Sequence, residues 1–76
     1  MNKQEHIVKI YNAAGEQVNF ERFAYKRADT VKKNFQKLLS NSLYAGLLKL
    51  DKASRAVCYA TPDGYHETTV VWEMSL

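Results

Sequence analysis

The run Asp29-Thr30-Val31-Lys32-Lys33-Asn34-Phe35-Gln36-Lys37-Leu38-Leu39 decides the fold class of this chain of 76 residues. Its apolar members stand at offsets of zero, four, seven and eight: Val31, Phe35, Leu38 and Leu39. That spacing is typical of one buried stripe on an α-helix. Asp29 or Thr30 suits the N-cap, because a side-chain oxygen there accepts hydrogen bonds from the free N–H groups of the first turn. The run therefore predicts a helix of about three turns.

The end of this helix is predicted near Asn41. Asn41 and Ser42 are weak helix formers, and Leu43 and Tyr44 would rotate away from the buried stripe. A later end is open, because Gly46 would serve as a C-cap. Residues 47–50 are too short to assign from their pattern, but they precede a polar turn at residues 51–54, so a strand there is one interpretation.

Strand-like segments lie on both sides of the helix. Residues 6–11 are rich in β-branched and aromatic side chains, and residues 17–21 alternate between polar and apolar, so we expect an N-terminal hairpin around the turn at 12–15. The apolar positions then shift parity to Phe23 and Tyr25, as at a β-bulge or an irregular strand end.

After the helix, residues 56–60 predict a further strand, and the Pro62 and Gly64 positions predict a tight turn at 61–64. The last strand is predicted from about Tyr65 to Met74, with Trp72 in the core.

These elements predict an α+β fold in which one helix packs on a small antiparallel sheet. The order is β-β-α-β-β, or β-β-α-β-β-β if residues 47–50 form a strand. No linker or repeat divides the sequence, so residues 1–76 are expected to form a single domain. A chain this short buries only roughly 60% of the surface that its unfolded form exposes, so the core must be small.

Charge is strongly segregated along the chain. All eleven Lys and Arg residues lie at or before Arg55, and residues 22–55 carry nine of them against Asp29 and Asp51. Residues 56–76 carry three acidic residues and no cation, so the three blocks 1–21, 22–55 and 56–76 have charges of −1, +7 and −3. A central stretch with most of the positive charge indicates where an anionic partner would dock.

On a helical wheel the lysines of residues 29–39 fall opposite the apolar stripe or on its flank. Together with the two cations that precede the helix they form the candidate binding residues: Lys26, Arg27, Lys32, Lys33 and Lys37. We expect them to contact phosphates of nucleic acid or carboxylates of an acidic protein surface. The competing interpretation is that lysines on an amphipathic helix only keep the protein soluble.

Two further binding modes follow from the sequence. The five tyrosines would stack with unpaired bases if they were exposed on the sheet. However, the RNA-recognition run, the Gly-x-x-Gly clamp and zinc-finger spacing are missing from the sequence. A Tyr ring also more often covers the edge of a core.

The alternative function is a protein-interaction or inhibitor module, of the kind found among bacterial, phage or plasmid accessory proteins. Such a module would act through a sheet edge or an exposed hairpin, and a homodimer through that edge is allowed.

An enzymatic function would have to use His6, His66 and Cys58, and these form no recognised motif. Both histidines are expected at strand ends on the core side, and Cys58 as a small buried side chain. We therefore expect a non-enzymatic protein with no cofactor and no metal.

The single cysteine favours a cytoplasmic location, because it cannot form an internal disulfide. The apolar runs are too short for a membrane span, and the polar start does not resemble a signal peptide, so neither is expected.

Overall fold

The computed structural model describes residues 4–76, which form an α+β domain with a four-stranded sheet. The expected α+β class is confirmed, but the order is β-β-α-α-β-β, with two helices in place of one. The elements are β1 (His6–Asn12), β2 (Gln17–Phe23), α1 (Ala28–Leu39), α2 (Ser42–Leu50), β3 (Ala53–Ala60) and β4 (Val70–Ser75).

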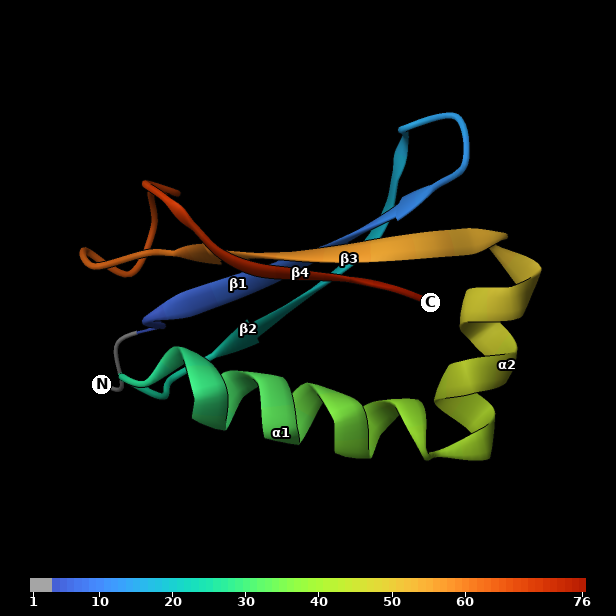
Figure 1. The fold of residues 1–76 in the computed structure, drawn as a ribbon, viewed down its shortest axis with the longest axis horizontal. Helices are drawn as coiled ribbons and strands as arrows, with labels where there is room; N and C mark the ends of the chain where they lie inside the picture. The colour runs from blue at the N-terminus through green and yellow to red at the C-terminus, as the bar shows by residue number, and fades with distance from the viewer. Residues whose placement is uncertain (1–3) are drawn as a thin grey trace.

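All neighbouring strands pair antiparallel, in the order β2-β1-β3-β4. β1 and β3 are the inner strands, with Val8 opposite Cys58, and β2 and β4 form the edges. Figure 1 shows α1 lying across one face of the sheet, while α2 stands at one end and leads the chain from α1 back to β3. Within residues 4–76 the other face of the sheet carries no helix.

The core lies between α1 and the sheet. It is built from alternate residues of the inner strands and from the inner sides of both helices: Val8, Ile10, Val31, Phe35, Leu48, Ala56 and Cys58, all buried. Trp72 of β4 packs against this core, as the sequence predicted, with its ring centroid 5.9 Å from that of Phe35. Its indole Nε1 donates a hydrogen bond of 3.0 Å to the Ala28 carbonyl, which ties the start of α1 to β4.

The second helix contradicts the prediction of a single helix and rules out the alternative in which residues 47–50 form a strand. The first helix does end close to the expected place, at Leu39, but residues 47–50 are helical and not a strand. The reason is Asn41, whose backbone is extended and whose side-chain Oδ1 accepts hydrogen bonds from the N–H groups of Leu43 and Tyr44 at 3.0 and 3.1 Å. A weak helix former thus starts a new helix as its N-cap. Gly46 lies inside α2 and is not a C-cap.

The start of α1 also differs from the prediction. The N-cap position is Arg27, which makes no side-chain capping bond, and neither Asp29 nor Thr30 occupies it. Asp29 lies in the first turn instead, where its carboxylate accepts from the backbone N–H of Thr30 at 3.1 Å. A carboxylate in the first turn still interacts favourably with the positive end of the helix dipole.

The last strand is shorter than predicted, because residues 61–69 form a loop. The predicted turn is present, with Gly64 at a φ of 86° and its N–H bonded to the Thr61 carbonyl at 2.9 Å. Beyond it the Asp63 carboxylate accepts from the backbone N–H groups of Tyr65 and His66 at 2.8 and 2.7 Å. These N–H groups are therefore unavailable to a strand ladder. Backbone hydrogen bonds to Ala60 begin at Thr68, and the regular strand starts at Val70.

Asn41→Ala is expected to lower the free energy of unfolding by about 1 kcal/mol, because two N–H groups at the start of α2 lose their acceptor. Urea unfolding followed by circular dichroism measures the change. Gln36→Ala, at an exposed site inside α1, is the control and should leave stability nearly unchanged. Equal effects of the two substitutions would contradict the capping role of Asn41.

Candidate functional site

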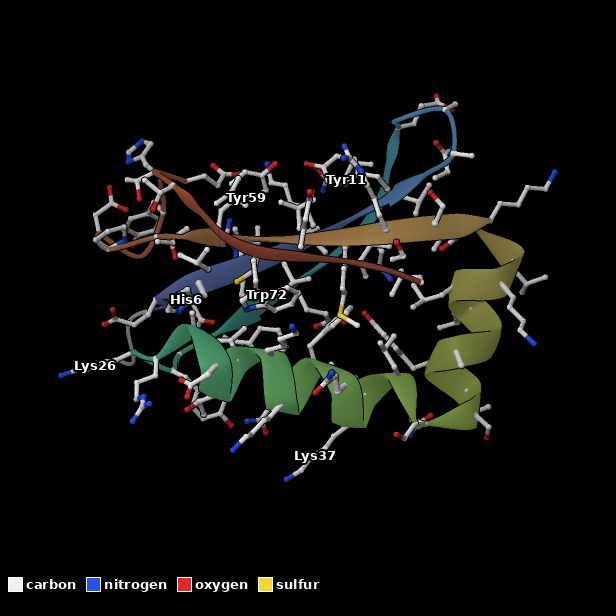
Figure 2. The ribbon with its side chains drawn as sticks, in the orientation of Figure 1. His6, Tyr11, Lys26, Lys37, Tyr59 and Trp72 are labelled. Atoms are coloured by element: carbon white, nitrogen blue, oxygen red, sulfur yellow. The ribbon has the colours of Figure 1, made fainter. Side chains whose placement is uncertain are left out.

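The cations predicted to bind lie on and next to α1. Lys26 and Arg27 occupy the segment that leads into the helix, and Lys32, Lys33 and Lys37 lie on the helix itself. All are exposed except Lys32, which is half-buried. Figure 2 shows Lys26 beside the start of α1 and Lys37 pointing away from the sheet. We call this set of five cations the α1 basic face.

One of the five cations is already paired. The Arg27 guanidinium donates to the Asp29 carboxylate through Nε at 3.1 Å and Nη2 at 3.0 Å, and this hydrogen bonding holds the pKa of Asp29 below its ordinary value. No acidic group lies within ion-pair distance of the four lysines anywhere in residues 4–76. Five cations against the single carboxylate of Asp29 leave the α1 basic face with a net charge of +4.

The opposite face of the sheet also carries cations, but most of these are paired. Lys9 forms an ion pair with Glu67, and Arg55 Nη1 lies 3.7 Å from a carboxylate oxygen of Glu73. Arg22 lies over the ring of Phe20, at 5.9 Å from its centroid. Three cations against two carboxylates leave a charge of only +1, so this face is a weaker site for an anion.

The tyrosines of that face do not offer free rings to a base. Figure 2 shows Tyr11 and Tyr59 on the side of the sheet away from α1, and their hydroxyl groups are 3.2 Å apart. Arg55 lies 5.1 Å from the ring centroid of Tyr11, and Lys9 lies 5.7 Å from that of Tyr59. Burial, with the neighbouring Tyr59, raises the pKa of Tyr11 to about 12. The rings thus contact the chain's own cations, which favours a structural role.

The remaining tyrosines occupy different environments. Tyr44 on α2 packs its ring against the core, as the sequence predicted for tyrosines in general. Burial, with a smaller effect of Glu21, raises its pKa to about 12. Tyr25 and Tyr65 are exposed.

The three residues with potential catalytic chemistry lie in unlike environments. Cys58 is buried in the core, and burial raises the pKa of its thiol to about 12. His6 is buried at the start of β1, on the core side as predicted, and its Nδ1 donates to the Tyr25 carbonyl at 2.8 Å. The prediction for His66 is wrong: it is exposed in the 61–69 loop, because Asp63 holds that segment out of the strand.

His66 forms an ion pair on the protein surface. Its Nδ1 lies 2.6 Å from the Asp63 carboxylate, and that hydrogen bond raises the pKa of His66 and lowers that of Asp63. Within residues 4–76 no three His, Cys, Asp or Glu side chains are grouped so that they would hold a metal ion.

The structure reveals a surface that the sequence analysis missed. Leu43, Leu47 and Leu50 of α2 are 81%, 55% and 80% exposed, and with Ser42 and Gly46 they line a groove of about 500 Å³. The offsets of four and seven between these leucines were a usable signal. The sequence pattern did not predict this helical stripe, because residues 47–50 are too short to assign and a strand is one interpretation of them.

Cys58 is expected to resist alkylation in the native protein, because its thiol is buried and stays protonated at neutral pH. Iodoacetamide labelling followed by mass spectrometry measures this. The same reaction in denaturant should go to completion. Rapid labelling of the folded protein would show that the thiol is accessible.

The pKa of His66 is expected to lie above 6.5 in a titration followed by NMR, and Asp63→Asn should return it toward that value. Because folding raises this pKa, the ion pair stabilises the loop below about pH 6.5, where Asp63 is still ionised, and the contribution is lost as the pH rises through the raised value. An unchanged midpoint in the variant would show that Asp63 does not cause the shift.

In the described part of the chain no helix is long and apolar enough to cross a membrane, and the cytoplasmic location stays a prediction. Comparison of the chain with models of protein families, with curated proteins and with solved structures finds no match.

Proposed function

We propose that this protein is a non-enzymatic binding module that holds an anionic partner, nucleic acid in the first place, on the α1 basic face. The observation that carries the proposal is the contrast between the two sides of the molecule. Four lysines near α1 have no carboxylate partner within residues 4–76, whereas Lys9 and Arg55 on the sheet are paired with Glu67 and Glu73. Unpaired cations on one surface attract an anion without first having to break an ion pair.

The chemistry of these residues favours contact with phosphates over reading of bases. Lysine presents a point charge on a flexible stem, and Lys33 and Lys37 are one helical turn apart, about 6 Å along the axis. Such side chains bind backbone phosphates of any sequence and release counterions as they do so. An acidic protein surface would meet the same cations, but it would not produce the same steep dependence on salt.

A second candidate function is a protein-interaction or inhibitor module that pairs a partner strand with β4. The observation that favours it is the edge position of β4, whose residues Val70 and Val71 are exposed and apolar. An edge strand with few charges accepts another strand through its free backbone groups. In that case the α1 basic face would serve solubility alone.

The double variant Lys33→Glu with Lys37→Glu is expected to weaken binding to labelled DNA or RNA by at least about tenfold at low salt, because two cationic contacts become repulsive. It should also reduce the slope of log affinity against log salt by about two. Fluorescence anisotropy with single-stranded and double-stranded probes measures both quantities. Both side chains are exposed on α1, so the thermal midpoint should stay nearly the same.

The matched control is Arg22→Glu with Lys49→Glu, which makes the same change in net charge on β2 and α2. An equal loss of affinity in both double variants would mean that the total charge, and not the α1 basic face, drives binding. If the wild-type protein binds neither probe at low salt, nucleic acid is excluded as the partner. A protein partner would then be the working hypothesis.

A further inference from the structure

The apolar stripe of α2 is surface that residues 4–76 leave uncovered. Tyr44 and Leu48 turn toward the core, while the three leucines at offsets of zero, four and seven point to solvent. These are Leu43, Leu47 and Leu50, which we call the α2 leucine stripe. Single exposed leucines are ordinary, but three on one side of a nine-residue helix form a contiguous apolar surface, which is typical of an interaction site.

Gly46 lies beside the α2 leucine stripe and is compatible with a close contact between two helices. It lies in the interior of the helix, where glycine is less stable than alanine, and its backbone does not adopt the positive φ that would require glycine. A Cβ placed on Gly46 would meet nothing within 4 Å. Neither its conformation nor the chain's own packing therefore requires glycine. A small residue beside an apolar stripe does, however, let a second helix approach closely.

The positions of these residues fit a two-fold axis. We propose that the α2 leucine stripe is a homodimer interface, in which α2 packs antiparallel against α2 of a second copy about an axis between Gly46 and Leu47. Leu43 and Leu50 are equally far from that axis, so Leu43 of each copy meets Leu50 of the other. Gly46 meets Leu47 across the axis, which puts a large side chain against a small one. In a two-fold interface each such contact occurs twice.

Charge complementarity supports a second copy as the occupant. The same symmetry brings Asp51, at the C-terminal end of α2, next to Ser42 at the N-terminal end of the other α2. A carboxylate is stabilised near the positive end of a helix dipole, and the serine hydroxyl is a donor for it. The residues that line the groove carry no charge, so the centre of the antiparallel contact contains no ion.

This interface is distinct from the surfaces discussed above. It uses neither the α1 basic face nor the exposed edge of β4, and it stands whether or not the protein binds nucleic acid. A homodimer through a sheet edge was one expectation from the sequence, and the α2 leucine stripe offers a different contact.

Sedimentation velocity of the purified protein over about a hundredfold range of concentration tests the proposal, because a dimer forms by mass action. We expect the wild-type protein to change from monomer to dimer as the concentration rises. Leu43→Lys with Leu50→Lys should weaken dimerisation by at least about tenfold, since ammonium groups then face each other across the axis. Lysine is as good a helix former as leucine, and both side chains are exposed, so circular dichroism should show a folded monomer.

A charge-swapped variant tests the antiparallel register. Leu43→Lys with Leu50→Glu places opposite charges together in both symmetric contacts, so it should dimerise more strongly than the double lysine variant. In a parallel arrangement the same substitutions would place like charges together. Val70→Lys is the control on the β4 edge. Val70 is 56% exposed, nearly the same fraction as the 55% of Leu47, and its substitution should leave dimerisation unchanged.

Three results would overturn the proposal. A wild-type protein that stays monomeric at every concentration would show that the stripe does not bind a second copy. Dimerisation that survives the double lysine substitution would place the contact elsewhere, and a loss caused by Val70→Lys would place it at the β4 edge. Failure of the charge-swapped variant to exceed the double lysine variant would exclude the antiparallel register.

Discussion

The packing of Phe35 against the sheet is the contact on which the rest of the structure depends. Its ring is fully buried between α1 and the inner strands and lies next to Trp72 of β4. Complete burial of such a side chain contributes about 1.5–3 kcal/mol, a large share of the net stability of a small domain. This contact and that of Val31 fix the rotation of α1 about its axis. Lys33 and Lys37 are consequently held on the outer side of the helix.

The acidic C-terminal block determines which cations remain unpaired. Glu67 and Glu73 lie on the face of the sheet that is remote from α1, where they neutralise Lys9 and Arg55. The lysines of α1 are on the other side of the molecule and gain no such partner within residues 4–76. The charge segregation along the sequence therefore becomes a difference between two surfaces. Because of that difference, the α1 basic face attracts an anion more strongly than the tyrosine-bearing face of the sheet does.

The second helix presents apolar residues in two directions. Leu48 closes one end of the core, and the α2 leucine stripe faces outward. Residues 4–76 therefore cover only one of the two apolar sides of α2, because a chain of this size buries a limited share of its surface. In the proposed dimer each particle would carry two α1 basic faces. Two linked binding surfaces hold a long anionic polymer more strongly than one, provided that their geometry allows both to engage it.

The sequence by itself determined the α+β class, the N-terminal hairpin, the first helix and the outward direction of its lysines. Each of these follows from local periodicity: Val31 and Phe35 recur with the helical repeat, and the strand residues alternate. The tertiary structure decided the second helix, because a nine-residue helix is too short to be stable alone and needs both the Asn41 cap and the packing of Leu48. It also decided which cations are paired, since the Lys9–Glu67 and Arg55–Glu73 contacts join segments far apart in the chain, and no local pattern encodes such a pairing.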